Sequence, residues 1–488
     1  MNAAEEMRMV GVLRVVLLAL FAVCTPELGK GANDVKVAAA ATEMAGDDSM
    51  EIGGGISPGH VSGQEGKLRA SAIVVEGDTK ICIVSCDVLA LQRDILDDVC
   101  RKVEAEENIP FENILITSTH THHAPTTVTV HGYKRDEIFC KRVKDAIVLA
   151  VHKANEKLKN APSASMYFWL GQESTVGQNS RLLLKDGTIY WVGSRDDALR
   201  PTGPFDPELP VLAFKRADGA LEALLFNHSS HNIGVRSNGR SPSFYGLAGQ
   251  ELEEELGGTT IFIPGAFGST HVLTLSMAER ILRIKNAVKE AYPKAEKREV
   301  SRVRSVKKTL KYQVRKFDED EEEKAVSYYC RKRLGGNPED IIEVFRKMRQ
   351  ELSKHQGEVR NSWLHVIVIG DIAFVGVPGE LFGKLGIEIK RRSPFRYTYV
   401  IALANDYIGY IPDRQAYDLG GYQLWTGLHS FVERGTGEAI VAEAIRLLEE
   451  LKEKSDEKMN YYQAPTHNHP KTTPSINWSS PYRKEQDN

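Results

Sequence analysis

Three histidines end an apolar run in the first third of the chain, and their spacing is the first sign of chemistry. The run begins at Ile114, and His120, His122 and His123 follow before Pro125. In an extended backbone, side chains two apart share a face, so His120 and His122 should point one way and His123 the other. Imidazole is the commonest metal ligand in proteins. The pattern indicates a metal-binding or catalytic pair at a strand end; a polar loop after a buried strand is the alternative.

A second apolar run also ends in histidines. It begins at Leu221 and leads into His228 and His231. Two strands that each deliver a histidine would let one metal ion collect ligands from separate parts of the chain, as catalytic zinc sites commonly do. Glu380 follows an apolar run over residues 373–377 and would complete a His/His/Glu set. The alternative for Glu380 is a carboxylate that stabilises the start of a helix.

Three further polar segments have less specific patterns. Residues 265–271 form a glycine-rich turn that either exposes backbone N–H groups and a hydroxyl to a substrate or makes a tight connection. The acidic run 318–324 is expected to be a solvated helix start, because carboxylates complement the helix dipole. His467 and His469 have the spacing of a metal clamp, but they lie in a polar, proline-containing tail.

Composition excludes several classes of protein. The chain has 488 residues, 42% of them hydrophobic and 26% charged, which is typical of a globular protein with a large core. Its net charge is −3 and no basic stripe is present, so no nucleic-acid partner is expected. Without the first residues, five cysteines remain, an odd number that does not indicate a disulfide scaffold.

Both ends of the chain differ from the rest. Arg8 and Arg14 precede an apolar run over residues 15–23, so residues 1–29 are predicted to be a signal peptide and the protein to be exported. Export would place it outside the cell, in a periplasm or on the cell surface, with lipid anchoring at Cys24 as the less favoured variant. Residues 455–488 are predicted to be a disordered tail.

Periodicity predicts an α/β fold. Residues 31–66 are rich in Ala, Gly, Asp and Ser, and residues 53–59 are expected to be a loop. The strand–helix–strand order that follows should place the first histidines at a carboxyl end of the sheet. Strands are predicted at 70–75, 80–88, 165–169, 188–192, 210–215, 260–264, 363–369, 373–377 and 398–404. Helices are predicted at 93–107, 136–158, 250–257, 278–291, 438–454 and, broken at 335–338, over 318–354. We therefore expect one large domain over residues 30–454, with mixed sheets flanked by helices.

Four motifs in order resemble the neutral ceramidase family. They are Thr119–His122 followed by a proline, Phe226–His228, Val377–Glu380, and Asn405–Tyr410 with Tyr422 further on. The resemblance covers the family's catalytic domain, roughly residues 35–452 here. It implies a zinc amidase that cleaves an N-acyl bond, of ceramide in the best-known members. The immunoglobulin-like C-terminal domain of long ceramidases is expected to be absent.

The resemblance also implies roles for individual residues. His122 and Tyr422 are similar to family residues that stabilise the substrate carbonyl or move protons. The implied zinc ligands are His120, His228, Glu380 and Tyr410.

This sequence departs from the family pattern at positions close to those motifs. Ser269 is an approximate counterpart of a serine in a different loop sequence, and Arg181 is displaced by one residue from the usual arginine. Both are retained as candidate catalytic residues. His123 stands where the family usually has a serine.

Two alternatives to ceramide hydrolysis stay open. One is a zinc hydrolase of a small N-acyl compound or an ester, and the other is a non-catalytic member that binds a ligand. A long apolar groove would favour a lipid, and a small polar pocket would count against one. The expected partner is an N-acyl lipid or a small amide, with contact to a membrane surface left open and no protein partner required.

Overall fold

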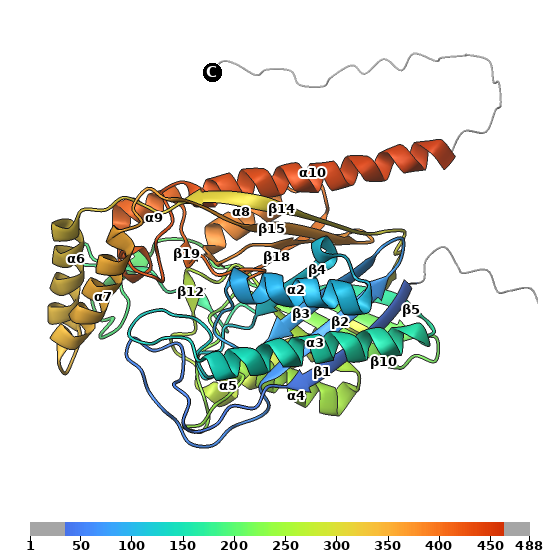
Figure 1. Ribbon diagram of the computed structural model, residues 1–488, viewed down its shortest axis with the longest axis horizontal. Coiled ribbons are helices and arrows are strands. Elements are labelled where there is room, and N and C mark those ends of the chain that lie inside the picture. The colour runs from blue at the N-terminus through green and yellow to red at the C-terminus, as the bar shows by residue number, and fades with distance from the viewer. Residues whose placement is uncertain (1–34, 463–488) are drawn as a thin grey trace, which may run out of the picture.

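The computed structural model describes the backbone of residues 35–462 and the side chains of residues 35–453. Two β-sheets pack against each other, and helices cover their outer faces (Figure 1). The predicted signal segment, Cys24 and most of the predicted tail lie outside the described residues, so these remain predictions. The α/β fold class is confirmed.

The larger sheet has the strand order β11-β10-β9-β5-β1-β2-β3-β4, and β13 also pairs with β5. It is mixed, because β3 pairs with β4 and β10 with β11 in parallel, while its other pairs are antiparallel. Its strands are β1 (Val35–Glu43), β2 (Arg69–Glu76), β3 (Lys80–Cys86), β4 (Ile114–Ser118), β5 (Ser163–Gln172), β9 (Glu208–Arg216), β10 (Leu221–His228), β11 (Thr259–Pro264) and β13 (Glu296–Arg298).

The second sheet has the order β14-β15-β16-β18, and its last pair is parallel. Its strands are β14 (Val303–Gln313), β15 (Val359–Ile369), β16 (Ile372–Gly376) and β18 (Tyr397–Ile401). Three short pairs lie beside the sheets: β6 (Gln178–Asn179) with β12 (Thr270–His271), β7 (Leu182–Leu184) with β8 (Ala198–Pro201), and β17 (Glu380–Leu381) with β19 (Tyr410–Ile411).

The helices complete a helix–sheet–sheet–helix arrangement (Figure 1). The larger sheet is covered by α2 (Arg93–Glu107), α3 (Glu137–Lys159), α4 (Ser243–Leu256) and α5 (Met277–Ala291). The second sheet is covered by α8 (Gly383–Arg392) and α10 (Thr436–Tyr462). The paired helices α6 (Glu319–Arg333) and α7 (Pro338–Ser353) stand at one end, and α9 (Arg414–Leu419) is a short helix.

The central core lies between the two sheets. Ile73 and Leu115 of the larger sheet contribute to the same buried cluster as Ile367 and Phe374 of the second. Alternate residues such as Val74 face the helices instead, because successive side chains of a strand point to opposite faces. Each sheet is therefore buried on both faces. This packing fixes the position of the strand ends of one sheet relative to those of the other.

The hairpin over residues 70–88 is confirmed, because β2 pairs antiparallel with β3, and α2 and α3 form where predicted. The loop predicted over residues 53–59 contains no helix or strand, but the small-residue segment before it forms β1, a central strand between β2 and β5 that no sequence pattern predicted. This strand contains four consecutive alanines, which have low strand propensity, and tertiary packing overrides that propensity. The small side chains of Ala38 and Ala40 pack in the cluster that α3 covers.

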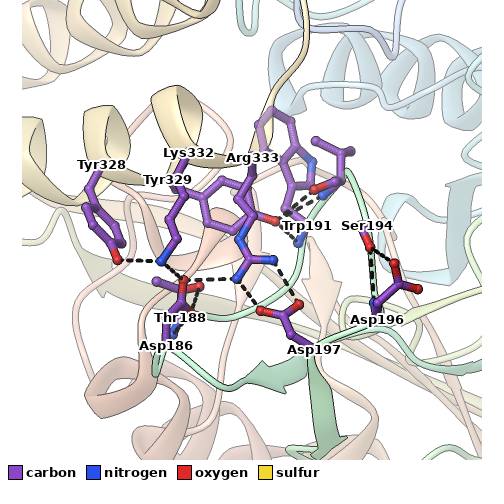
Figure 2. Close-up of polar contacts among 11 residues, drawn as sticks. Asp186, Thr188, Trp191, Ser194, Asp196, Asp197, Tyr328, Tyr329, Lys332 and Arg333 are labelled. Carbon is purple, nitrogen blue, oxygen red and sulfur yellow. Dashed lines mark hydrogen bonds and ion pairs between the residues drawn. The ribbon is translucent and has the colours of Figure 1, made fainter.

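The predicted strand over residues 188–192 does not form, apart from a single bridge at Ile189. A tyrosine of α6 satisfies the backbone there instead. The Tyr329 hydroxyl accepts the N–H of Trp191 at 2.8 Å and donates to the carbonyl of Val192 at 3.0 Å (Figure 2). Sequence periodicity carries no information about such a partner.

Two helix ends also differ from prediction. Helix α4 begins at Ser243 rather than at 250, because buried Phe244 and Tyr245 stabilise a first turn that its glycines disfavour. Helix α10 continues to Tyr462, into the segment predicted to be disordered. The acidic run is the predicted helix start, because the Asp318 side chain accepts the Glu321 N–H at 3.0 Å.

No helix within residues 35–462 is both long enough and apolar enough to cross a membrane.

The packing between the sheets predicts a large effect of truncating Phe374, which is 0% exposed. Phe374→Ala should lower the free energy of unfolding by about 3–5 kcal/mol, because a cavity replaces a ring in a close-packed core. Denaturant unfolding measures this. Val359→Ala is the control, since Val359 is 63% exposed and its truncation should change stability by about 0.5 kcal/mol or less. Equal effects of the two substitutions would contradict this description of the core.

Candidate active site

Three histidine rings meet at the carboxyl ends of parallel strand pairs. His120 and His122 follow β4, which pairs in parallel with β3, and His231 follows β10, which pairs in parallel with β11. One ring nitrogen from each of the three histidines lies within 4.8 Å of the other two. Open α/β sheets commonly place their sites at this end of the strands. The structure thus brings His120 and His122 together, as their spacing predicted.

Each of the three rings is fixed by a backbone carbonyl. A carbonyl only accepts hydrogen bonds, so each Nδ1 carries the proton and each Nε2 is left with a lone pair. All three lone pairs face the same small volume. The Nδ1 donors and their acceptors are His120 with Leu89 at 2.8 Å, His122 with Gly54 at 2.9 Å, and His231 with Thr270 at 2.8 Å.

The Glu380 carboxylate faces the same volume. Its Oε2 lies 3.1 Å from Nε2 of His231 and 3.5 Å from Nε2 of His120. Its Oε1 accepts a hydrogen bond from the Tyr407 hydroxyl at 3.2 Å, but Oε2 accepts none from any described group. A buried carboxylate oxygen that faces imidazole lone pairs without a donor is unfavourable unless a cation lies between them. The residues present therefore fit a bound divalent metal, and nitrogen and carboxylate donors are those that zinc takes.

Tyr410 completes this group. Strand β17 begins with Glu380 and pairs in parallel with β19, so that Glu380 and Tyr410 are direct neighbours. The Tyr410 hydroxyl lies 3.2 Å from Nε2 of His231. Burial, and then the charge of Glu380, raise the pKa of Tyr410 well above its ordinary value. Its hydroxyl therefore keeps its proton in the metal-free protein.

His228, expected to be a metal ligand, is not brought to this group. Its Nδ1 is hydrogen-bonded to the Tyr245 hydroxyl at 2.5 Å and its Nε2 to the Glu173 carbonyl at 2.8 Å. Both ring nitrogens are therefore occupied within the core. His231, three residues on, lies in the loop after β10 and reaches the other rings. The apolar run pointed to both histidines, but it did not tell which one turns inward.

The backbone around the histidines and Glu380 leaves little space for additional side-chain atoms. His120 has a φ of 60°, in the left-handed region that non-glycine residues rarely occupy. A Cβ at Gly54 would lie 2.6 Å from the His122 side chain, and one at Gly268 would lie 2.1 Å from the Glu380 carbonyl. Close backbone approach therefore holds both the histidine pair and the carboxylate.

Ser269 and Arg181 lie outside the group that the three histidines form with Glu380 and Tyr410. The Ser269 hydroxyl accepts the N–H of Gly383 at 3.1 Å, at the start of α8. Gly268 of the same turn donates its N–H to the Leu381 carbonyl at 2.9 Å, so residues 265–271 pack tightly on β17. Of the two alternatives for this turn, the tight connection describes these contacts.

Arg181 is buried and positions the segment that carries Tyr422. Its guanidinium donates to Oε1 of Gln423 at 2.9 Å and to the Gly420 carbonyl at 2.7 Å. Burial lowers its pKa to about 10, so it remains charged at neutral pH. The described contacts make it a support for the Tyr422 segment rather than a group that faces the histidines.

Tyr422 lies at the side of the histidine group, where it lines the same pocket. Its hydroxyl is hydrogen-bonded to Nε2 of His131 at 3.1 Å, and its ring stacks on Trp191 with centroids 4.6 Å apart. Burial raises the pKa of Tyr422 well above its ordinary value, so the phenol is neutral and able to donate a proton or hydrogen bond. No sequence motif marked His131 or Trp191 as functional, because His131 stands alone in a loop and Trp191 lies in a segment whose pattern predicted only a strand.

A pocket of about 480 Å³ opens onto these residues. Its polar side includes His122, Ser180, His231, His271, Tyr410 and Tyr422, and its apolar side includes Ile56, Trp191, Val192, Ile233 and Leu273. The His271 ring stacks on His231 with centroids 3.8 Å apart. A slightly larger hollow of about 520 Å³ lies elsewhere and contains no histidine, so the size of a cavity does not locate the site.

The chain has the fold of neutral ceramidase. Its structure is similar to the crystal structure of neutral ceramidase from Pseudomonas aeruginosa, with a TM-score of 0.67, 17% identity, and coverage of 86% of this chain and 75% of that one. A structure of ceramidase complexed with C2 gives a TM-score of 0.67 and 16% identity, with coverage of 86% and 76%. No family model and no curated protein matches the sequence.

The contact between Gly268 and Glu380 predicts that Gly268→Ala is destabilising. The added Cβ would force the turn away from the Glu380 backbone, at a cost of about 1–3 kcal/mol in the free energy of unfolding. Thermal unfolding measures this, and Gly335→Ala is the control because a Cβ there meets nothing within 4 Å. If Gly268→Ala were as stable as Gly335→Ala, the turn would not be packed on β17.

Proposed function

We propose that this protein is a zinc-dependent amide hydrolase of the neutral ceramidase family that cleaves the N-acyl bond of a lipid amide to a fatty acid and an amine. The observation that carries the proposal is the unpartnered Glu380 oxygen facing three imidazole lone pairs beside a pocket. The ceramidase fold supports the same activity. A non-catalytic member would not need to keep this donor set.

Four residues are proposed to hold the zinc. Glu380 approaches only His120 and His231 closely enough to form an ion pair among the described histidines, and Tyr410 contacts His231. His231 thus takes the position that the sequence motifs assigned to His228. His122 belongs to the same group of rings, but no ion pair joins it to Glu380 and no tyrosine hydroxyl contacts its Nε2 among the described residues. We therefore assign His122 to the substrate side and His120, His231, Glu380 and Tyr410 to the metal.

The chemistry follows from this division. Bound zinc would supply a Lewis acid for the amide carbonyl and lower the pKa of a bound water to about 7. His122 is neutral, because burial and then the nearby His231 lower its pKa well below the ordinary value. Its Nε2 lone pair is placed to accept a proton from the attacking water and to return it to the leaving nitrogen. The Tyr422 phenol is placed to donate a hydrogen bond to the oxyanion as the tetrahedral intermediate forms.

The pocket suggests how the substrate is held. The carbonyl would face the histidines, and the acyl chain would lie along the apolar side formed by Ile56, Trp191 and Val192. A volume of about 480 Å³ lies within the range of about 300–1,000 Å³ for small-molecule sites. The second chain of a two-chain lipid would therefore extend beyond the pocket. The same volume favours a small N-acyl compound or ester as the second candidate substrate.

Metal content tests the ligand assignment. His231→Ala should reduce bound zinc from about one per chain to a small fraction and abolish amide hydrolysis, because it removes a ligand. His122→Ala should lose activity and keep zinc. Elemental analysis of the purified proteins, together with fatty-acid release from ceramide and from short N-acyl amines, measures both properties.

His228→Gln is the control for these variants. It removes the ligand assigned from the motifs and should keep its zinc, since His228 is hydrogen-bonded elsewhere. Loss of zinc in His228→Gln but not in His231→Ala would restore the motif assignment. Loss of zinc in His122→Ala would make His122 a ligand. Wild-type protein that binds no zinc after reconstitution, with no hydrolysis, would refute the proposed function.

Tyr422→Phe tests the oxyanion donor. Removing one hydroxyl should lower kcat about 10²- to 10³-fold with zinc content unchanged, because the lost hydrogen bond forms mainly in the transition state. Steady-state kinetics on the best amide substrate measures the effect. A rise in KM at unchanged kcat would instead assign Tyr422 to ground-state binding. Tyr190→Phe is the matched control, since Tyr190 lines the pocket without a described contact to the histidines.

A further inference from the structure

One wall of the pocket is held from outside by helix α6. The wall belongs to residues 185–197, named here the Trp191 loop, which connects β7 to β8. Tyr190, Trp191 and Val192 of this loop line the pocket. Backbone hydrogen bonds close the loop, from Tyr190 to Leu182 at 2.8 Å and from Lys185 to Asp197 at 3.0 Å, and side chains from elsewhere hold it from outside. Figure 2 shows that these side chains come from one stretch of α6.

Charged groups join both ends of the loop to α6 (Figure 2). The Arg333 guanidinium donates to both carboxylate oxygens of Asp197, at 2.9 and 2.6 Å, and to Asp186 at 2.9 Å. Lys332 donates to the same Asp186 oxygen at 2.7 Å. The Arg333 side chain is 10% exposed, so water screens these ion pairs less than ordinary surface pairs. One arginine thus connects the beginning of the loop to its end.

The middle of the loop is fixed by Tyr329. Its hydroxyl accepts the N–H of Trp191 and donates to the carbonyl of Val192, at 2.8 and 3.0 Å. These two bonds hold the backbone on either side of the Trp191 side chain. Tyr329 and Arg333 are four residues apart on α6 and therefore lie on the same helix face. Helix α6 thus determines where the indole lies.

The Trp191 indole lines the pocket beside Tyr422 and packs on Trp425, which does not line it. Its ring plane is 4° from that of Tyr422, and its edge meets Trp425 with centroids 5.6 Å apart. Trp191 has the largest apolar side chain among the residues that line the pocket. Since it stacks on the tyrosine assigned to the reacting carbonyl and lines the same pocket, it lies beside the position proposed for the first carbons of an acyl chain.

We propose that Trp191 determines which acyl groups the pocket accepts and that Arg333 and Tyr329 are positioning residues that act through it. This inference rests on the proposed function, because it assumes that the pocket binds an N-acyl compound. The substrate class it specifies is an amide whose acyl chain contacts an indole. The ion pairs of Figure 2 are then part of the specificity of the enzyme and not only of its stability.

The test compares Trp191→Ala, Arg333→Ala and the double variant with the wild-type zinc protein. Binding of an N-acylethanolamide series, from acetyl to palmitoyl, is measured by calorimetry, and kcat and KM are measured for each member. Trp191→Ala should weaken binding of the preferred acyl chain about tenfold, because its contact area is lost, and shift the preference along the series. Arg333→Ala should shift the preference for acyl-chain length in the same direction.

Coupling between the two residues is the decisive result. If Arg333 acts through Trp191, adding Arg333→Ala to Trp191→Ala should change binding no further, whereas independent effects would add. Arg331→Ala is the matched control, since Arg331 lies on the same helix but pairs with Glu339 of α7, and it should behave as wild type. Asp197→Asn breaks the same ion pair from the loop side and replaces Arg333→Ala if that variant does not fold.

Two failures are distinguishable. One outcome is that no amide is hydrolysed while binding of the series still depends on Trp191 and is coupled to Arg333. In that case the proposed function is wrong, but the inference that Trp191 selects the acyl group is retained. An unchanged chain-length preference in Trp191→Ala, or additive effects in the double variant, would overturn the inference while hydrolysis by the wild type kept the proposed function.

Discussion

The buried carboxylate of Glu380, which lies among three imidazole lone pairs, is the interaction on which the rest of the site depends. Such a group is electrostatically unfavourable by itself, because neither its Oε2 nor the facing nitrogens supply a proton to share. Folding must therefore hold it in place. The structure does this with backbone carbonyls on each Nδ1, a left-handed His120, and a glycine turn too close to Glu380 for any side chain. A divalent cation converts this arrangement from a source of instability into a binding site.

The two-sheet core explains why these groups meet. The histidines follow β4 and β10 of the larger sheet, whereas Glu380 and Tyr410 stand on the short β17–β19 pair beside the second sheet. Burial between the sheets fixes their relative position, because both inner faces contribute to one close-packed cluster. Polar bonds cross this junction as well, such as that from the Thr117 hydroxyl to the Ala402 carbonyl at 2.6 Å. The floor of the pocket is consequently rigid.

The wall of the pocket is built differently from its floor. The floor is held by sheets and close backbone contacts, but the Trp191 loop is held by ion pairs and one tyrosine hydroxyl from α6. Under the proposed function, a change in this wall would alter which substrate is accepted without changing the residues that face the histidines. This division agrees with a common fold that persists at 17% identity.

The sequence by itself determined the elements with regular periodicity and the pair of histidines closest together in the chain. It predicted α2, α3, the β2–β3 hairpin and the inward pair His120 and His122, because these follow from local repeats of 3.6 and 2 residues. Tertiary structure alone decided that His231 rather than His228 joins them, since both follow the same strand and only packing shows which ring is hydrogen-bonded elsewhere. It also made the alanine-rich β1 a central strand and kept residues 188–192 out of a sheet. Those outcomes depend on partners distant in the chain, and local sequence does not encode which distant group will satisfy a backbone or a ring nitrogen.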